Sequence, residues 1–287
     1  MTVLVPTGLD EALAALADAP DAHVLAGGTD LMVELNHGRR RPPAVIAVGR
    51  VPELRGWSVE DGGVLRVGAA TTYTELMAPA PAALAPALAA ASRTVGSPQI
   101  RNAGTIGGNL GTASPAGDTL PVLVALDAEV ELASASGRRR LSVAEFLTGP
   151  KRTALAPAEL IVAVRFPSLG SAGAQEYLKV GTRNAMVIAV ASCAVVVEPA
   201  HRTVRVGLGS VGPVPLRAPA AEAWATEHVD WADGAVDDPD TFGRLVAEAA
   251  RPIDDHRSTA AYRRHAVAVL AARGLRRCLR TATEAAA

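Results

Sequence analysis

The sequence predicts a protein that mixes α-helices with β-strands and divides into two or three domains. Apolar residues recur at helical spacing in some segments, as at Leu9, Leu13 and Leu16. They alternate with other residues elsewhere, as in residues 64–68, which is typical of a strand. At 287 residues, the chain is long enough to bury a core in more than one domain.

The first 56 residues are expected to combine strands and helices. Asp10 and Glu11 lie in the first turn of an expected helix, where the helix dipole stabilises acidic side chains. The expected elements are strands at 3–5, 23–25 and 44–48, a helix at 9–16, a helix of one or two turns at 31–35, and a connector at 51–57.

The middle of the chain is expected to contain both helices and paired strands. Thr74 is a candidate N-cap for a helix that begins at Glu75, because its hydroxyl can accept a bond from a backbone N–H. An Ala- and Leu-rich helix is expected to continue through Pro86. The expected elements are strands at 64–68, 129–133, 138–141 and 160–166, and helices at 82–92 and 120–126.

A glycine-containing segment, residues 169–173, is the best candidate for a linker to the last part of the chain. Arginines make the final helix basic, and we interpret it as a solvated or subunit-facing surface. His256 and His265 are expected to be structural. The expected elements are strands at 176–180, 187–197 and 203–208, and helices at 222–224, 242–250 and 258–280.

The composition argues against several classes of protein. The formal net charge is −1 and aromatic residues make up 3% of the chain, so nothing favours binding to nucleic acid or to an anionic membrane. The first residues do not have the pattern of a secretory signal. The longest strongly apolar run, residues 185–197, is too short for a membrane-spanning helix. We therefore expect a cytoplasmic protein with no membrane span.

The two cysteines, Cys193 and Cys278, lie far apart and offer no disulfide framework. An iron–sulfur cluster usually takes four thiolates, so this chain cannot hold one alone. No residues have the spacing of a metal site, and no nucleophile with a supporting base can be defended. We expect no metal site and no catalytic side chain.

Two glycine-rich stretches, residues 26–30 and 104–118, are the most informative motifs. Glycine has no Cβ, so successive backbone N–H groups can converge on an anion. Each stretch alone has a simpler interpretation: an ordinary turn with Asp30 as a helix cap, or a plain loop. Together they predict a ligand whose diphosphate is held from both sides, for which a dinucleotide cofactor is the natural candidate.

Residues 207–212 match the pattern G-x-G-x-x-G after a strand, which is typical of a Rossmann dinucleotide site. Such a site requires a helix to begin at the turn. Pro213, Pro215 and Pro219 follow instead, and proline inside a helix costs about 3 kcal/mol or more. We reject the Rossmann interpretation.

Lys179 and Arg183 place two cations near a turn that follows an expected strand. Most surface lysines and arginines are simply solvated, and that interpretation remains open here. The alternative is that Lys179 lies against the anionic side of a cofactor.

The glycine-rich motifs resemble those of the FAD-binding subunit of the molybdenum hydroxylases, a family that includes xanthine dehydrogenase and the medium subunit of carbon monoxide dehydrogenase. The likeness covers nearly the whole chain and is strongest with the flavin subunits of bacterial xanthine dehydrogenases. The segments that carry it are 26–30, 100–109, 114–118, 179–189, 209–213, Arg217 and 262–264.

The resemblance implies an α+β fold. Residues 1–56 and 57–168 would form the two subdomains of an FAD-binding fold of the PCMH or vanillyl-alcohol-oxidase type. Residues 174–287 would form a C-terminal α+β domain of the carbon monoxide dehydrogenase flavoprotein type.

The resemblance also implies which residues hold FAD. The two glycine stretches would wrap the diphosphate, mostly through main-chain N–H groups, and Asp118 would bind ribityl or adjacent sugar hydroxyls. Ile161 and Val95 would pack near the flavin ring, and Lys179 would favour negative charge at its polar edge. The full set is Val24, Leu25, Ala26, Gly27, Gly28, Thr29, Asp30, Val95, Thr105, Ile106, Gly107, Gly108, Asn109, Asp118, Ile161 and Lys179.

One segment departs from the family pattern. Relatives often carry an acid shortly after the residue that corresponds to Arg183, where this chain has Met186 and Val187. The departure argues against an ion pair to Arg183 and leaves FAD binding unaffected.

The function implied is that of an electron-transfer subunit of a xanthine dehydrogenase-like enzyme. Molybdopterin and [2Fe-2S] clusters would reside on partner subunits, and FAD would pass electrons to NAD⁺ or another acceptor. The alternatives are a flavin subunit of a carbon monoxide, aldehyde or aromatic-heterocycle hydroxylase, or a scaffold subunit without flavin.

Overall fold

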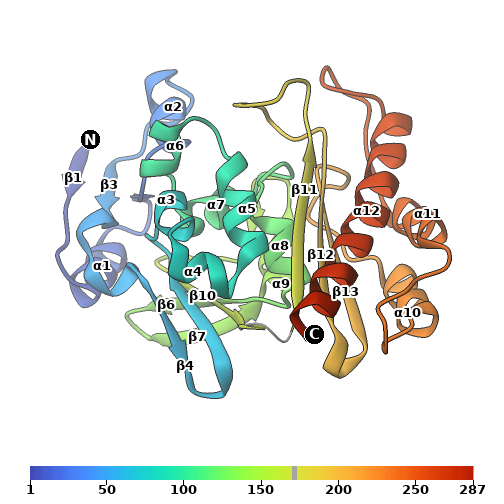
Figure 1. The fold of residues 1–287 in the computed structure, drawn as a ribbon. Coiled ribbons are helices and arrows are strands. Elements are labelled where there is room, and N and C mark those ends of the chain that lie inside the picture. Colours follow the sequence, from blue (N-terminus) through green and yellow to red (C-terminus); the bar gives the residue numbers. More distant parts are fainter. Residues whose placement is uncertain (170–172, 287) are drawn as a thin grey trace.

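The computed structural model describes residues 1–169 and 173–286 (Figure 1). Three groups of elements follow one another along the chain, coloured blue, green, and yellow to red. The linker expected at 169–173 falls largely on residues 170–172, which lie outside the described residues.

The first group is a small parallel sheet in which β3 (Ala44–Ala47) lies between β1 (Thr2–Leu4) and β2 (His23–Leu25). Helix α1 (Leu9–Asp18) packs its apolar face into the same core. Helix α2 (Leu31–Asn36) follows the first glycine stretch, and all of its described residues are at least partly exposed. The strands and helices expected in this part are confirmed.

The second group is an antiparallel sheet packed against several helices. Strand β10 (Leu160–Pro167) lies between β5 (Val64–Gly68) and β6 (Glu129–Ser134). Strand β4 (Trp57–Glu60) continues the sheet beyond β5, and β7 (Gly137–Ser142) continues it beyond β6. The remaining elements are α3 (Tyr73–Leu76), α4 (Pro79–Leu84), α5 (Pro86–Thr94), α6 (Pro98–Ala103), α7 (Ile106–Thr112), α8 (Leu120–Ala125), α9 (Val143–Phe146), β8 (Leu147–Gly149) and β9 (Arg152–Thr153).

Two helices of this group differ from the sequence expectation. The helix expected to continue through Pro86 is broken, because α4 ends at Leu84 and α5 begins at Pro86. Proline lacks the N–H that the preceding helix would need and disfavours a helical residue before it. The cap of α3 is Thr72 rather than Thr74, since Thr72 and Glu75 exchange hydrogen bonds in a capping box.

The third group is an antiparallel sheet in which β12 (Ala191–Glu198) lies between β11 (Ala174–Val180) and β13 (Thr203–Gly209). The long helix α12 (Ala260–Ala286) packs on β11 and β12, and α8 of the second group packs on β12 and β13. Figure 1 shows this sheet between α8 and α12. The other helices are α10 (Pro219–His228) and α11 (Pro239–Ala249).

Strand β12 is buried on both faces, which explains its almost continuous apolar sequence. Cys193 and Val195 belong to the core that includes α12, whereas Ala194 and Val196 belong to the core of the second group. The strand begins later than the expected residue 187.

The rejection of a Rossmann turn at residues 207–212 is confirmed, because strand β13 is followed by turns and α10 begins only at Pro219. Gly207 has a packing role instead. A Cβ atom there would lie 1.8 Å from the carbonyl oxygen of Pro121 in α8. The glycine allows the strand and the helix backbone to approach each other.

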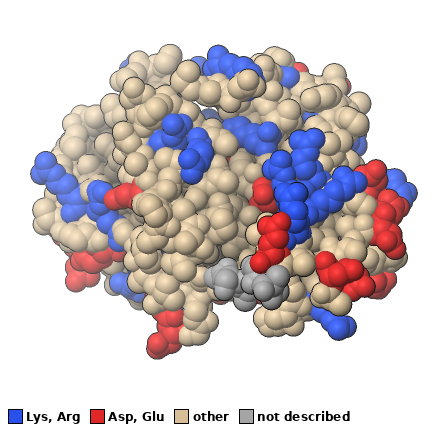
Figure 2. Space-filling model, viewed as in Figure 1, with Lys and Arg blue, Asp and Glu red and all other residues tan. Residues whose placement is uncertain are grey.

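Arg263 differs from the solvated arginines expected along α12, because it is buried. Its Nη1 donates to the carbonyl oxygen of Ser210 at 2.7 Å, and its Nη2 donates to Oδ1 of Asp255 at 2.6 Å. A buried guanidinium requires such partners in place of water. Other arginines of the helix are exposed, and Figure 2 shows Lys and Arg side chains gathered where β11 and α12 lie in Figure 1.

Both cysteines are free and buried in the core. Burial raises the pKa of each thiol, so both stay protonated at neutral pH. Within residues 1–169 and 173–286, no helix combines the length and the apolar character needed to cross a membrane.

Candidate functional site

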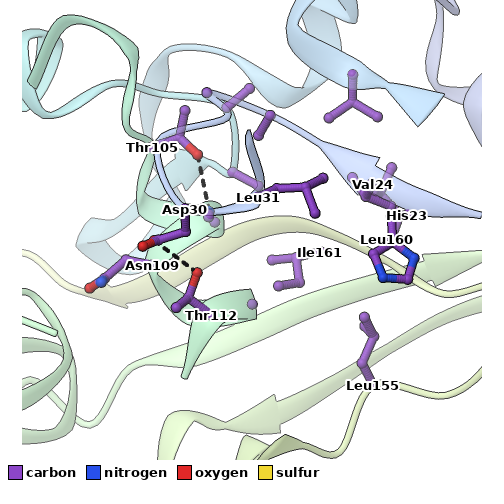
Figure 3. A pocket seen from close by; sticks show the side chains of 18 of the residues that line it. His23, Val24, Asp30, Leu31, Thr105, Asn109, Thr112, Leu155, Leu160 and Ile161 are labelled. Atoms are coloured by element: carbon purple, nitrogen blue, oxygen red, sulfur yellow. Dashed lines mark hydrogen bonds between the residues drawn. The ribbon is translucent and has the colours of Figure 1, made fainter. Parts of the chain in front are cut away.

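A cavity of ≈ 400 Å³ lies where the first and second groups of elements meet (Figure 3). Both glycine stretches contribute to its wall, together with β10 and the segment around the β8–β9 hairpin. A volume of this size is typical of a small-molecule site. The predicted residues that line it are Val24, Ala26, Gly27, Gly28, Thr29, Asp30, Thr105, Gly107, Gly108, Asn109 and Ile161.

The first glycine stretch presents unused donors to this cavity. Within the described residues, the backbone N–H groups of Gly27, Gly28, Thr29 and Asp30 donate to no protein acceptor. These four consecutive groups belong to residues of the cavity wall. Gly28 has a φ of +72°, which turns the backbone there. Such a run of N–H groups is suited to bind phosphate oxygens.

Gly27 brings the two glycine stretches into contact. A Cβ atom at this position would lie 1.7 Å from the carbonyl oxygen of Ala103, just before the second stretch. No side chain can occupy that space without moving one backbone away from the other. The glycine therefore allows the two stretches to pack closely against each other.

The second glycine stretch differs from the expectation that its N–H groups face the ligand. The N–H of Ile106 donates to the carbonyl of Thr71, that of Gly107 to Ala69, and that of Gly108 to the hydroxyl of Thr105. These bonds arise because the stretch begins helix α7 and packs against the segment after β5. Its glycines line the cavity as a close-packed wall, and the N–H groups of Ile106, Gly107 and Gly108 already have partners.

Asp30 also differs from the simple cap that the sequence allowed. It occupies the N-cap position of α2, but its side chain makes no capping hydrogen bond. Its Oδ2 instead accepts a bond from the hydroxyl of Thr112 at 3.1 Å, as Figure 3 shows. The side chain thus connects the first glycine stretch to α7.

The opposite part of the cavity is apolar. Val24, Leu155, Leu160 and Ile161 lie together there in Figure 3, with His23 beside them. Aliphatic side chains of this kind can pack on the faces of a flat heterocycle. The cavity therefore combines donors for an anion with an apolar surface for a ring.

Sequence reasoning missed a charged group of residues on the wall, namely His23, Glu34, Arg40 and Lys151. Nζ of Lys151 lies 3.2 Å from Oε1 of Glu34, and Nε of Arg40 is paired with Oε2 of the same carboxylate. Glu34 follows Asp30 by one helical turn, and this spacing could have indicated it. Nothing local in the sequence indicates Lys151, which is far away in the chain.

Five of the predicted residues lie outside the cavity wall: Leu25, Val95, Ile106, Asp118 and Lys179. Ile106 is part of the hydrophobic core of the second group. The carbonyl oxygen of Val95 accepts a bond from Nη1 of Arg101 at 3.0 Å. The structure therefore gathers the two glycine stretches and Ile161 around one cavity and places these five elsewhere.

Asp118 and Lys179 form a buried ion pair, with 2.8 Å between Oδ2 and Nζ. Oδ1 of Asp118 accepts a bond from the hydroxyl of Tyr177 at 2.9 Å, and Nζ of Lys179 also donates to the carbonyl of Thr94. Burial raises the pKa of Asp118, and the charge of Lys179 opposes that rise. Burial and the Asp118 carboxylate raise the pKa of Tyr177 well above its usual value. Tyr177 is a further residue that sequence reasoning missed.

Arg183 forms no ion pair within the described residues, as the sequence departure led us to expect. Its guanidinium donates to the carbonyl oxygens of Ala185 and Met186 in the same loop. Without an acid at this position, the Arg183 side chain stays exposed, and its hydrogen bonds stabilise its own loop.

The residues of the cavity fit FAD. A phosphate has only acceptor oxygens, and the four free N–H groups of residues 27–30 offer only donors. The apolar part of the wall suits a heterocyclic ring. Among the described residues, no group of His, Cys, Asp and Glu has the arrangement of a metal site.

Known proteins are similar to this chain in both sequence and fold. The chain is 35% identical over 227 residues to a putative xanthine dehydrogenase FAD-binding subunit of Escherichia coli strain K12, with 76% of each chain covered. It is also 35% identical over 219 residues to the carbon monoxide dehydrogenase medium chain of Hydrogenophaga pseudoflava, covering 74% of this chain and 75% of that one. A chain in the solved structure of quinoline 2-oxidoreductase from Pseudomonas putida 86 matches with a TM-score of 0.88 at 26% identity, covering 99% of this chain and 98% of that chain.

Two family descriptions match the chain. Residues 1–169 match the FAD binding domain in molybdopterin dehydrogenase, and residues 176–278 match the CO dehydrogenase flavoprotein C-terminal domain. The expected α+β fold and the FAD cofactor are confirmed by these matches and by the structural likeness. The chain therefore belongs to the family of FAD-binding oxidoreductase subunits of the molybdenum hydroxylases.

Proposed function

We propose that this chain is the electron-transfer subunit of a xanthine dehydrogenase-like molybdenum hydroxylase. The observation that carries the proposal is a row of four N–H groups, on residues 27–30, that have no acceptor within the described part of the chain and belong to the wall of a cavity with an apolar side. The xanthine dehydrogenase subunit from Escherichia coli supports the substrate class, since it is similar over most of its length.

The residues of this chain would bind and position the cofactor. The N–H groups of residues 27–30 would hold the diphosphate, while the second glycine stretch would form the close-packed wall beside it. Leu25 and Ile106 would support the two stretches from behind. Ile161 and Val95 would contact the flavin ring, and Lys179, held by Asp118, would favour negative charge at the ring's polar edge.

FAD held by these residues would supply the redox chemistry, namely electron transfer from iron–sulfur clusters to NAD⁺ or another acceptor. The clusters and the molybdopterin would belong to an iron–sulfur subunit and a large subunit in the cytoplasm. The two buried cysteines of this chain are consistent with clusters held elsewhere. Residues 1–56 and 57–168 would act as the two FAD-binding subdomains, and residues 174–287 as the C-terminal domain.

A carbon monoxide hydroxylase is the second candidate. The medium chain of carbon monoxide dehydrogenase from Hydrogenophaga pseudoflava is 35% identical to this chain, so the same subunit would serve that reaction equally well. The two candidates differ in the substrate that reduces the flavin. Purified complex given xanthine or carbon monoxide would show bleaching of the flavin absorbance with only one of them.

The first experiment is a visible absorption spectrum of the purified chain, with the released chromophore identified by chromatography. We expect the two flavin absorption bands and FAD as the released compound. A colourless protein that does not take up added FAD would contradict the proposal. Copurifying iron–sulfur and molybdenum proteins, identified by metal analysis, would test the proposed partners.

A further inference from the structure

Glu34 is held on the cavity wall between two cations. Nζ of Lys151 lies 3.2 Å from its Oε1, and Nε of Arg40 pairs with its Oε2. The Glu34 side chain is 22% exposed, whereas those of Arg40 and Lys151 are 47% and 65% exposed. The carboxylate is therefore the inner member of the group, and the two cations reach it from the solvent side.

The network keeps this carboxylate charged and fixed. Hydrogen bonds from Lys151 and Arg40 lower the pKa of Glu34, so it is ionised at neutral pH. Lys151 has a φ of +57°, a conformation in which glycine is usual, and its N–H donates to the carbonyl of Ala113 at 2.9 Å. A lysine rather than a glycine occupies this unusual backbone conformation, and its side chain contacts Glu34. Strained residues of this kind often mark ligand sites.

Glu34 is one helical turn beyond the free N–H groups. Residues four apart on a helix are separated by about 6 Å along its axis and share a face. Asp30, Leu31 and Glu34 accordingly all line the cavity. A ligand whose phosphate binds the N–H groups of residues 27–30 would place its next chemical group within reach of Glu34.

The cavity wall offers one partner for each chemical group of a nucleotide. Phosphate oxygens accept hydrogen bonds, and the N–H groups of residues 27–30 donate them. Ribose hydroxyls donate hydrogen bonds, and a carboxylate only accepts them. The same cavity wall carries the apolar side chains of Val24 and Leu160, which provide a surface for a base. Among residues 1–169 and 173–286, each oxygen of Glu34 has one protein donor, which leaves acceptor capacity for a ligand.

We propose that Glu34 binds the ribose hydroxyls of the adenosine half of the dinucleotide, with Lys151 and Arg40 as positioning residues that hold its carboxylate. The inference rests on the proposed function, because it assumes that FAD occupies this cavity. It assigns the part of the cavity around Glu34 to the adenosine half of the cofactor and makes Glu34 a residue that distinguishes FAD from FMN, which has no adenosine.

The test is a comparison of two ligands that differ only at the ribose. The full chain, stripped of flavin, is titrated calorimetrically with ADP and with 2′,3′-dideoxy-ADP. Loss of hydrogen bonds to a charged group should weaken binding about ten- to a hundredfold, so the wild type should prefer ADP by that factor. In Glu34→Gln, which keeps one acceptor oxygen but removes the charge, the preference should fall severalfold, because a hydrogen bond to a neutral group contributes less. In Glu248→Gln, which removes an exposed acid from α11, it should stay as in the wild type.

Each other outcome has a defined meaning. A wild type without preference, or a Glu34→Gln variant with the full preference, would overturn the inference. Glu34→Asp keeps the charge on a shorter side chain, and an unchanged preference there would also contradict it. A wild type that rebinds FAD but not ADP refutes the inference alone, whereas one that rebinds neither refutes the proposed function.

Discussion

The ammonium group of Lys179 lies 2.8 Å from a carboxylate oxygen of Asp118, and the two side chains are only 7% and 9% exposed. Asp118 precedes α8 in the second group of elements, while Lys179 belongs to β11 in the third. Tyr177, also on β11, binds the other carboxylate oxygen. The pair therefore joins the FAD-binding half of the chain to the C-terminal sheet.

Replacing one residue of this ion pair should destabilise the protein more than replacing both residues. Asp118→Asn leaves the ammonium of Lys179 buried without a counter-ion, and Lys179→Met leaves the carboxylate in the same situation. Each single variant should lower the free energy of unfolding by about 3–5 kcal/mol. The double variant should recover most of that loss, because neither charge remains buried. Urea denaturation followed by circular dichroism measures all three differences.

Additive losses in the double variant would show that the two residues act separately. Glu248→Gln on the exposed face of α11 is a suitable reference and should change the free energy of unfolding by less than about 0.5 kcal/mol.

Removing the charge of Lys179, which we propose to lie at the polar edge of the flavin ring, should also lower the reduction potential of bound FAD. A nearby cation stabilises the more negatively charged reduced flavin, so Lys179→Met should shift the potential downward. A shift of about 30 mV would correspond to ~1.4 kcal/mol for the two-electron couple. Titration with redox dyes measures it. Lys151→Met, at the proposed adenosine end, should leave the potential unchanged, and equal shifts in both variants would contradict the assignment.

A side chain at Gly27 should disrupt the cavity. In Gly27→Ala the new methyl group would overlap the carbonyl oxygen of Ala103, and a backbone group cannot move aside as a side chain can. We expect a loss of about 3 kcal/mol or more in the free energy of unfolding, together with loss of bound FAD. Gly49→Ala is the matched control, because no atom lies within 4 Å of a Cβ built there.

Thermal unfolding and the flavin content of the two purified variants give the comparison. If Gly27→Ala retained the stability and flavin content of Gly49→Ala, the two glycine stretches would not need their close contact.

Glu131 should make the stability of the middle sheet depend on pH. Burial opposes its ionisation, but ion pairs with Arg66 and Arg138 hold its pKa below the ordinary value. A lowered pKa in the folded state stabilises the protein at pH values above the unfolded pKa, and this contribution is lost as the pH falls through the folded pKa. Glu131→Gln should therefore be less stable than the wild type by about 1–3 kcal/mol at pH 7.

The difference in the free energy of unfolding between the wild type and Glu131→Gln should become smaller as the pH falls below 4.5, the ordinary pKa of the carboxyl group. Urea denaturation at pH 7 and at successively lower pH values measures it. A gap that stays constant would show that the carboxylate charge of Glu131 does not contribute.

Local patterns predicted most of the elements correctly. The helix around Leu13 and the strand that contains Val67 follow from spacing alone, because each buries one face against a single core. Predictions failed where a backbone detail decided the outcome, as at the break before Pro86 and at the cap of α3. Both details were present in the sequence, in the proline itself and in the spacing of Thr72 and Glu75.

The residues of the candidate site were also predicted only in part. Glycine stretches are visible in a sequence, and the cavity wall includes most residues of both predicted runs. The sequence did not indicate which hydrogen-bond acceptors the N–H groups of these glycine stretches would bind. Gly107 donates to Ala69 and Ile106 to Thr71, and these pairings arise only when the segment after β5 packs against α7.

The sequence by itself determined the α+β class, most of the longer helices and strands, the family and the FAD cofactor, because these depend on residue type and short spacing. Only the tertiary structure decided which groups face the cavity and which are already bonded. Lys151 contacts Glu34 although 117 positions separate them, and Lys179 contacts Asp118 across two groups of elements. Such pairs form because packing of the apolar cores brings distant segments together, and no local pattern specifies which distant side chains then meet.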